Sequence, residues 1–471
     1  MTPPTDLAPQ PLLSRERLRQ FDVPGPRYTS YPTADRFVEA FTPEDYRQAL
    51  WSRATGVGTV GGASPLSVYV HIPFCESVCY YCACNKVITK HHERAAEYVA
   101  ALEREMALHA QVLGAGQVVS QLHLGGGSPT FLSDGELCRL MDSLRQVFRF
   151  ARGAEVSIEV DPRTVTSARL KHLRDLGFNR LSLGVQDFDP AVQRAVHRVQ
   201  SEQLVEELMR QAQALGFAST NVDLIYGLPK QTPLSLQRTV DKVSRLRPDR
   251  IALYGYAHLP QRFKPQRRID PAALPPASEK VHMLSLAIAG FEKAGYHYIG
   301  MDHFALPSDS LAVAKRQGRL HRNFQGYSTQ PDCDLIGLGV SSIGRVGGTY
   351  SQNAKTLPEY YDAIDQGRFP VVRGLALSRD DLVRRAVIMA LMCQGRVEYE
   401  SIALAHLIDV EDYFARELSQ MQDLQDQGLV RLEPGAVELT PMGWYFVRAV
   451  AMVFDRHLQV DKTRERFSKI I

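Results

Sequence analysis

Four cysteines lie close together in this sequence, and their spacing allows chemistry that an isolated thiol lacks. Cys75, Cys79, Cys82 and Cys84 fall within ten residues, whereas the other three cysteines are scattered. Thiolates at the spacing C-x3-C-x2-C can bind three irons of a 4Fe–4S cubane and leave its fourth iron open to another ligand. An open iron is what the binding and reduction of S-adenosylmethionine (SAM) require, because the amino and carboxyl groups of SAM chelate that iron.

A structural zinc site is the main alternative for the same cysteines. Such a site closes a tetrahedron with four protein ligands, usually from two pairs that are well separated in sequence. Here Cys84 follows Cys82 after a single residue, and no second C-x2-C pair follows downstream. A tight group in a large chain also differs from the spread cysteines of a small secreted disulfide protein. The spacing therefore favours an iron–sulfur cluster over zinc.

Short apolar runs that alternate with amphipathic stretches must position the cysteine segment. The runs predict six strands, at residues 66–72, 119–124, 156–160, 180–185, 221–225 and 250–256. The stretches between them predict helices at residues 93–113, 134–148, 164–176, 202–215 and 234–246. This alternation indicates a parallel sheet, and the largely apolar strands indicate that both of its faces are covered. The expected fold is a partial (β/α)6 TIM-like barrel of the α/β class.

Residues that could do chemistry follow the predicted strands at their carboxyl ends. They are His71 and the cysteines after the first strand, Gly125-Gly126-Gly127 after the second, Glu159 and Asp161 at the third, Gln186 and Asp187 at the fourth, Asp223 at the fifth, and Ala257-His258 at the sixth. Any one of the polar groups could be a buried strand-end residue bonded to backbone. In a parallel β/α barrel, however, this end carries the active site, so their joint placement favours a shared site.

The sequence divides into three parts. Residues 1–60 form a Pro-rich N-terminal arm whose segment 25–33 cannot be a regular helix and lacks the periodic apolar pattern of a core element. Residues 61–375 form the barrel with its extension. Residues 376–471 are helix-rich and contain a hairpin at 429–439, an order that resembles a winged helix. We expect the barrel to fold without residues 1–35.

Composition excludes several classes of function. The chain has 471 residues and a formal net charge of +3, which is too small to argue for nucleic-acid binding. The first residues lack the basic and apolar segments of a signal peptide. No apolar stretch approaches the roughly 18 residues of a membrane helix. We therefore expect a cytoplasmic protein that binds neither nucleic acid nor a membrane.

Two motifs resemble those of a known superfamily. The pattern C-x3-C-x-φ-C, with Tyr81 at the aromatic position, resembles the signature of the radical SAM superfamily. The turn at 125–130 resembles its SAM-binding glycine motif, where the backbone must approach the ligand closely. Nearly the whole chain further resembles the oxygen-independent coproporphyrinogen III oxidase family of haem biosynthesis. The matching segments are PRYTSYPT (26–33), YVHIPFC…C..C.C (69–84), QLHLGGGSPT (121–130), SIEVDP (157–162), GVQDF (184–188), HRVQ (197–200), DLIYGLP (223–229) and YSQNA (350–354).

The resemblance implies roles for individual residues. The cluster ligands would be Cys75, Cys79 and Cys82, and Cys84 would be an extra family cysteine that does not bind the cluster. The SAM on the cluster would contact Tyr69, Gly126, Glu159 and Ile343, beside the ring of Tyr81. A second SAM molecule would contact Gly127, Ser128, Gln186, Arg198, Asp223 and Ala257. Two departures from the family pattern are mild: Ser128 replaces the common Thr, and Tyr81 replaces the common Phe.

The resemblance also implies a mechanism and partners. A reduced cluster splits SAM into methionine and a 5′-deoxyadenosyl radical, which takes hydrogen from the β-carbon of a propionate of coproporphyrinogen III. Loss of CO2 and one electron leaves a vinyl group, and two such rounds give protoporphyrinogen IX. An electron donor such as flavodoxin or ferredoxin and an unidentified electron acceptor would take part, and the chain would act as a monomer. Arg27, Tyr28 and Tyr31 are candidates to bind the propionates or close the pocket, since Arg pairs carboxylates bidentately.

Two other functions fit the same scaffold. A haem chaperone would carry haem on a similar barrel, but such relatives usually lack a cysteine at position 84 and the arm motif at 27–33, both of which are present here. A radical SAM methyltransferase would share the cluster and differ in its products.

Overall fold

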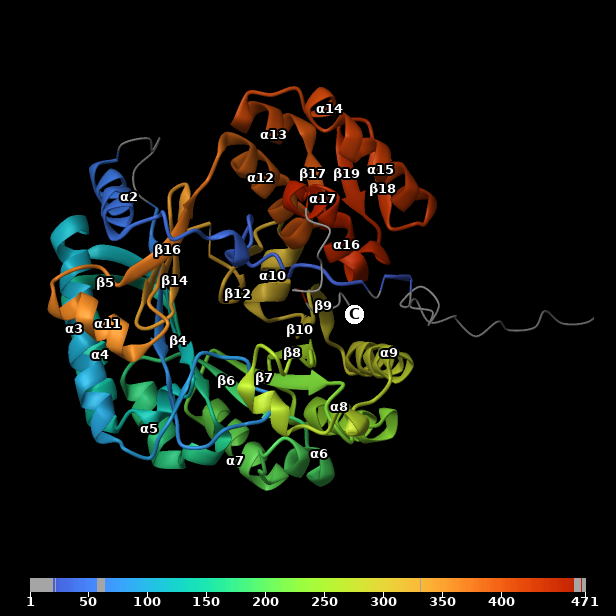
Figure 1. Cartoon of the computed structure of the whole chain (residues 1–471). Coiled ribbons are helices and arrows are strands. Elements are labelled where there is room, and N and C mark those ends of the chain that lie inside the picture. The colour runs from blue at the N-terminus through green and yellow to red at the C-terminus, as the bar shows by residue number, and fades with distance from the viewer. Residues whose placement is uncertain (1–19, 22, 57–63, 331, 461–466, 468–471) are drawn as a thin grey trace, which may run out of the picture.

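Six parallel strands in chain order form the centre of the molecule. The computed structural model describes residues 20–21, 23–56, 64–330, 332–460 and 467 (Figure 1). The six strands are β1 (Leu66–Ile72), β4 (Gln117–Gly126), β5 (Phe148–Val160), β6 (Arg180–Gln186), β7 (Ser219–Tyr226) and β8 (Arg250–Gly255). They pair side by side in the order β1-β4-β5-β6-β7-β8, each parallel to its neighbour. The predicted partial barrel is confirmed, and β5 begins earlier than predicted.

Helices connect the strands and cover the outside of the sheet (Figure 1). They are α3 (Glu93–Leu113), α4 (Asp134–Val147), α5 (Ser167–Asp175), α6 (Pro190–Ala195), α7 (Glu202–Ala214), α8 (Pro233–Leu246) and α9 (Ala277–Lys293). Ser133 and Glu136 form a reciprocal capping box at the start of α4, which satisfies backbone N–H groups there. The five predicted helices are present, while the short α6 has too few residues to give a periodic signal.

Further strands extend the sheet at both edges. Beyond β1 lie β13 (Asp334–Leu338), β14 (Ile343–Val346), β15 (Thr349–Asn353) and β16 (Val371–Ala376); beyond β8 lie β10 (His303–Ala305) and β9 (His297–Gly300). β13 is parallel to β1, and each of the other added strands is antiparallel to the strand it joins. The Tyr- and His-rich residues 296–304 predict one strand, but a turn at Met301 and Asp302 splits them into two. Both turn residues have positive φ, a conformation that periodicity does not reveal.

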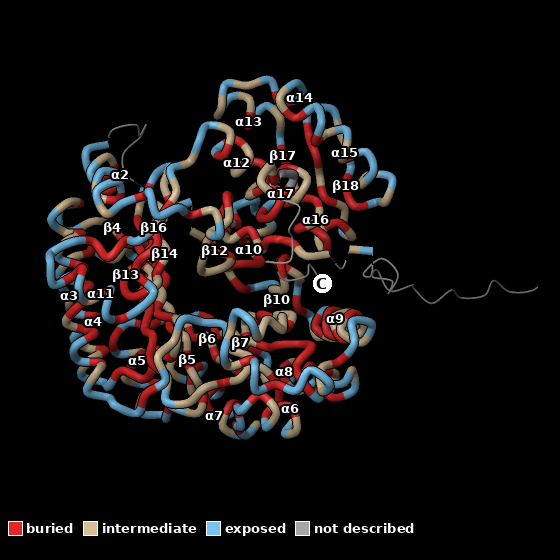
Figure 2. The backbone as a smooth tube through the Cα atoms, in the orientation of Figure 1, coloured by how far each residue is buried: buried red, intermediate tan, exposed pale blue. Residues whose placement is uncertain are grey.

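Short elements complete the barrel and its extension. They are β2 (Phe74–Cys75), β3 (Val87–Ile88), η2 (Pro129–Phe131), η3 (Pro162–Thr164), η4 (Lys264–Arg268), η5 (Pro271–Ala273), α10 (Ser310–Arg316), β11 (His321–Asn323), β12 (Gly326–Ser328) and α11 (Leu357–Asp365). The core lies between the sheet and its helices, where Figure 2 shows the strands as mainly buried. No helix in the described ranges is long and apolar enough to cross a membrane.

The C-terminal part packs above the sheet edge in Figure 1. Its elements are α12 (Arg379–Gln394), β17 (Arg396–Glu398), α13 (Tyr399–His406), α14 (Val410–Tyr413), α15 (Ala415–Asp426), β18 (Val430–Glu433), β19 (Ala436–Leu439), η6 (Gly443–Phe446), α16 (Val447–Met452) and α17 (Arg456–Val460). The predicted hairpin is β18–β19, and β17 adds a third strand.

The N-terminal segment runs between the barrel and the C-terminal part (Figure 1). It contains η1 (Ala34–Arg36) and α2 (Pro43–Thr55), and Tyr28 and Tyr31 are at most 1% exposed within the main hydrophobic core. The absence of a periodic pattern predicted a segment outside the core. Irregular backbone can bury aromatic side chains without any period, so this signal fails here. The predicted boundary after residue 60 lies outside the described residues.

Candidate active site

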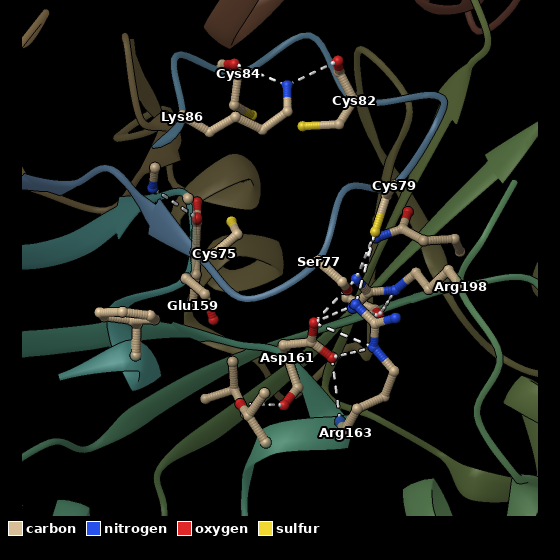
Figure 3. Close-up of a pocket in the computed structure, with 18 of the residues that line it drawn as sticks. Cys75, Ser77, Cys79, Cys82, Cys84, Lys86, Glu159, Asp161, Arg163 and Arg198 are labelled. Atoms are coloured by element: carbon tan, nitrogen blue, oxygen red, sulfur yellow. Dashed lines mark hydrogen bonds and ion pairs between the residues drawn. The ribbon is translucent and has the colours of Figure 1, made fainter. Parts of the chain in front are cut away.

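A cavity of about 550 Å3 opens at the carboxyl ends of the parallel strands. Its walls combine the cysteine loop, the glycine turn and the ends of β5 to β8, as the sequence predicts. Thirteen of the residues singled out by the sequence line it: Cys75, Cys79, Tyr81, Cys82, Cys84, Gly126, Gly127, Ser128, Glu159, Asp161, Gln186, Arg198 and Asp223. Figure 3 shows many of these side chains together.

Two short strands close the cysteine loop at its base. Phe74 pairs with Val87 through β2 and β3, and the buried Phe74 ring fixes this end of the loop in the core. Lys86 donates hydrogen bonds from Nζ to the carbonyls of Cys82 and Cys84, each at 3.2 Å. The loop is thus fixed through its backbone, which leaves its thiols on the cavity wall.

The thiols lie in unlike electrostatic surroundings. Cys79 Sγ accepts hydrogen bonds from Arg198 at 3.4 Å and Arg163 at 3.6 Å. A hydrogen bond from the Cys84 thiol lowers the pKa of Cys82 to about 6. Burial, together with the charge of the neighbouring sulfurs, raises the pKa of Cys75 to about 12. A metal replaces the proton of each thiol that it binds. A metal at Cys75 would therefore also remove the energetic cost of burying an isolated thiolate there.

The arrangement of the thiols fits a group larger than one ion. Among the described residues, no three His, Cys, Asp or Glu side chains converge so that they could hold a single metal ion. Cys75, Cys79 and Cys82 instead stand apart around the loop (Figure 3), and no cysteine forms a disulfide within the described part of the chain. A cubane cluster spreads its irons over several ångströms and takes one thiolate at each of three corners.

The glycine turn brings bare backbone to the cavity. Gly126 has φ +115°, which side chains rarely adopt, and a Cβ there would lie 2.6 Å from the His71 ring. A Cβ on Gly127 would lie 2.6 Å from the carbonyl oxygen of Pro73. Both positions therefore require glycine, and both expose backbone at the wall where a ligand can approach closely.

Glu159 places a carboxylate beside this turn. It accepts hydrogen bonds from Gly126 N at 3.0 Å and from His123 at 3.4 Å. Desolvation raises the pKa of Glu159, but the bonds and charge of His123 and the Gly126 N–H outweigh it and hold the pKa below its ordinary value. The carboxylate is therefore charged at neutral pH, and it is partly exposed to the cavity. It can bind a ligand's ammonium group.

A group of one aspartate between two arginines lies beside Cys79 (Figure 3). Asp161 pairs with Arg163 at 2.7 Å and with Arg198 at 3.2 Å. Desolvation raises the pKa of Asp161, and the two guanidinium groups more than offset this and lower it. Because both arginines also reach Cys79, the group holds positive charge against a sulfur of the loop.

Asp223 and Tyr254 form the floor of the cavity. Burial raises the pKa of Asp223 to about 6, although bonds from Ser182 and Asn221 lower it. The floor continues into a second cavity of about 250 Å3 within the barrel, which Glu159, Ser182, Asp223 and Tyr254 also line. There both amide atoms of Gln325 are buried without a hydrogen-bond partner in the described residues. Such a group fits a polar ligand.

Three predicted ligand residues do not line the cavity. Tyr69 stacks on His123 with ring centroids 5.9 Å apart, and its hydroxyl lies 3.1 Å from His71. The carbonyl of Ala257 accepts a bond from Gln266 at 3.2 Å, and Ile343 pairs with Gln352 in the sheet extension.

The three arm residues have different surroundings. Arg27 pairs with Asp302 at 2.5 Å, and its guanidinium lies 5.2 Å from the ring centre of Tyr254, a residue of both cavities. Tyr28 is buried and donates to Asp455 at 2.9 Å. Tyr31 is also buried, and its hydroxyl accepts from Arg456 N at 3.3 Å. The structure therefore brings Arg27 toward the cavities and places both tyrosines in the interface with the C-terminal part.

The sequence analysis missed several residues of the two cavities, among them Lys86, His123, Arg163, Tyr254 and Gln325. Arg163 and Tyr254 stand at strand ends, so the rule that selected Glu159 could have selected them too. Lys86 ends the cysteine loop. Gln325 lies between β11 and β12, in a segment without a sequence signal, and only the fold brings it to the barrel.

Comparisons with known proteins agree with this architecture. The family model of the radical SAM superfamily matches residues 69–243, and that of the HemN C-terminal domain matches residues 377–446. The oxygen-independent coproporphyrinogen III oxidase of Pseudomonas aeruginosa is 48% identical, with 96% of this chain and 98% of that protein covered. The enzyme of that name from Escherichia coli K12 is 46% identical, with 96% and 97% covered.

A solved structure shows the same fold. It is described as coproporphyrinogen III oxidase (HemN) from Escherichia coli, a radical SAM enzyme, and it superposes with a TM-score of 0.89 at 46% identity, covering 95% of this chain and all of that chain. The aligned regions span almost the whole length of the chain, so the similarity includes the barrel and the C-terminal part together. This chain belongs to the oxygen-independent coproporphyrinogen III oxidase family of radical SAM enzymes.

Proposed function

We propose that this site decarboxylates two propionate side chains of coproporphyrinogen III to vinyl groups, giving protoporphyrinogen IX without oxygen. In each round the propionate loses one hydrogen atom from its β-carbon, its carboxyl group as CO2, and one further electron. The observation that carries the proposal is the meeting of three thiols, a bare glycine turn and a charged carboxylate on one cavity wall, in a chain of this family.

Cys75, Cys79 and Cys82 would hold a 4Fe–4S cluster. When bound, the cluster and SAM supply the reducing electron and the carbon radical that takes hydrogen from the substrate. In this arrangement Cys84 is not a ligand: its thiol donates to Cys82 and favours the thiolate there. Arg198 and Arg163 would stabilise the negative charge on Cys79 in the same way.

The glycine turn and Glu159 would orient SAM on the cluster, with Tyr81 beside it and with Tyr69 and Ile343 supporting that wall. The bare backbone at Gly126 allows close approach, and the ionised Glu159 would pair with the SAM ammonium group. A second SAM molecule is proposed at the residues that the family resemblance indicates: Gly127, Ser128, Gln186, Arg198, Asp223 and Ala257. All of these except Ala257 line the cavity.

Arg27 would bind a substrate propionate above the barrel. It lies over Tyr254, which joins the two cavities, and its present partner Asp302 can be exchanged for a substrate carboxylate. Tyr28 and Tyr31 would act less directly, by fixing the arm through Asp455 and Arg456. We also propose the division into an arm (1–60), a barrel with its extension (61–375) and a C-terminal domain (376–471).

The remaining partners are proposals too: a one-electron donor protein of the flavodoxin or ferredoxin type, an electron acceptor of unknown identity, and a monomeric, cytoplasmic chain. The decisive assay mixes anaerobic protein with coproporphyrinogen III, SAM and a reductant. Protoporphyrinogen IX is expected, with two CO2 released per molecule. Binding of tetrapyrrole without turnover would instead support the haem-carrier alternative, and a methylated product would support a methyltransferase.

A further inference from the structure

A small hydrophobic cluster, separate from the main core, lies behind the cysteine loop. Its buried members are Val192, Val196, Ile225, Leu228, Tyr256 and Ile269, and Tyr80, Tyr81 and Leu274 pack against it. The cluster therefore joins four segments to one another: the cysteine loop, the helix α6 with the residues after it, the end of β7 with the turn that follows, and the long connection between β8 and α9. Any partner that contacts these neighbours also contacts the cysteine loop.

Hydrogen bonds to backbone carbonyls join the cysteine loop to two of these segments, the residues after α6 and the connection between β8 and α9. Gln266 Nε2 donates to the carbonyl of Tyr81 at 3.1 Å, and Tyr80 N donates to the carbonyl of Val196 at 2.9 Å. The His197 ring lies 2.9 Å from the carbonyl of Val78. Because these bonds reach the residues between Cys75 and Cys82, the neighbouring segments are rigidly coupled to the proposed ligands.

The outer surface of these neighbours is basic. We name the exposed residues Arg194, Lys264, Arg267 and Arg268 the basic collar. The connection from 258 to 269 contains no Asp or Glu, whereas the whole chain has 55 basic and 52 acidic residues. The nearby carboxylates are engaged elsewhere: Asp270 caps η5, Asp189 caps α6 and Glu76 pairs with His92. The local excess of positive charge is therefore not a consequence of composition.

The collar reaches the cysteine loop without entering the cavity. Tyr81 lines the cavity, whereas the Tyr80 ring stacks on His197 at 5.1 Å and lies 5.3 Å from the Arg268 guanidinium. None of the four collar residues is among the cavity lining. Tyr80 directly follows Cys79, so the collar touches the residue next to a proposed cluster ligand. Val199, 62% exposed, adds an apolar surface two residues beyond His197.

We propose that the basic collar is the docking surface for an acidic one-electron carrier protein that reduces the cluster. The inference rests on the proposed function, which requires one electron for every SAM molecule split. One electron passes from the reduced carrier to the oxidised cluster, and no atom is transferred. A carboxylate-rich carrier is steered to this surface by opposite charge. Docking behind Tyr80 leaves the cavity free for SAM and the porphyrinogen, so reduction and substrate binding do not compete for space.

The test uses the full-length, cluster-loaded protein with Lys264, Arg267 and Arg268 all changed to Glu. Cluster reduction is followed by stopped-flow absorbance with an acidic flavodoxin, reduced to its hydroquinone, and separately with dithionite. At low ionic strength we expect at least about a tenfold slower reaction with flavodoxin, because charge reversal removes the steering. The difference from the unchanged protein should shrink as salt is added. The rate with dithionite should stay unchanged.

A matched control makes the same change in net charge at another part of the surface. Arg149, Arg152 and Arg431 are exposed and lie outside the collar and the cavity, so their change to Glu alters net charge equally. Equal slowing in this control would overturn the docking site, and so would an unchanged flavodoxin rate in the collar variant. If the triple variant lost iron, the R267Q/R268Q pair would replace it, with a loss of several-fold expected. Failure of the unchanged protein to turn over even with dithionite would instead contradict the proposed function.

Discussion

The cysteine loop and segment 25–33 of the N-terminal arm both lack regular structure, yet the fold uses them in opposite ways. The loop is fixed through its backbone, by Lys86 and by β2–β3, and presents its thiols to a cavity. The arm is fixed through its side chains as well: the hydroxyls of Tyr28 and Tyr31 are buried and paired with the C-terminal part. Arg448 further holds the arm backbone by donating to the carbonyl of Pro26 at 2.9 Å.

This difference separates two kinds of irregular segment. Where polar side chains are buried and paired within the protein, their removal costs stability. Where ionisable side chains face a cavity with shifted pKa values, as at Cys82 and Asp223, their removal costs a ligand or an activity. Arg27 belongs to the arm by sequence and lies over Tyr254, which lines both cavities, so it is the residue at which the two kinds meet.

The largest effect is expected at the loop. Changing Cys75, Cys79 and Cys82 together to Ala should remove all of the cluster, from about four irons per chain to none, since no thiolate ligand remains. Iron and acid-labile sulfide analysis of anaerobically purified protein measures this, together with the visible charge-transfer absorption. Stoichiometric zinc without sulfide in the unchanged protein would contradict the cluster assignment.

Arg27→Ala should weaken substrate binding while leaving the cluster intact. We expect an increase of roughly tenfold in KM for coproporphyrinogen III, equivalent to about 1.4 kcal/mol, from the loss of one charged carboxylate contact. The cleavage of SAM in the absence of substrate should be unaffected. Arg27→Lys keeps the positive charge but lacks the bidentate guanidinium group. Its KM should lie between that of the unchanged protein and that of Arg27→Ala. An unchanged KM in Arg27→Ala would remove the arm from the substrate site.

Asp455→Ala should loosen the arm without changing the cluster. It leaves the buried Tyr28 hydroxyl without its acceptor, at a cost of about 1–3 kcal/mol. Hydrogen exchange of the backbone amides in residues 27–33 should accelerate by about tenfold, with iron content unchanged. The exposed Asp423 on α15 provides the control, because its change to Ala touches no arm residue. Loss of iron in Asp455→Ala would show that arm and loop are one structural unit.

The smallest effect is expected at Cys84. If this residue tunes Cys82 and is not a ligand, Cys84→Ser should keep the full iron content and cluster spectrum, because a hydroxyl can still donate to the Cys82 sulfur. Cys82→Ser, measured beside it, should lose iron. Equal losses in the two variants would mean that the three ligands are wrongly assigned.

The sequence predicts the barrel well because its strands and helices carry strong periodic signals. It also predicts the cavity wall, since Glu159, Gln186 and Asp223 stand at strand ends, whose position follows from the fold. It does not predict the burial of Tyr28 and Tyr31, which depends on contacts with residues more than 400 positions away. The same holds for Gln325, because nothing local marks a loop that the fold carries to the barrel interior.

The most direct test of the account follows one hydrogen atom. Coproporphyrinogen III carrying deuterium at the β-carbons of its propionates is turned over anaerobically with SAM and a reductant, and the 5′-deoxyadenosine formed is analysed by mass spectrometry. We expect one deuterium in each 5′-deoxyadenosine and two 5′-deoxyadenosines per protoporphyrinogen IX. Unlabelled 5′-deoxyadenosine accompanying the vinyl product would show that hydrogen leaves by another route, and would contradict the proposed use of this site.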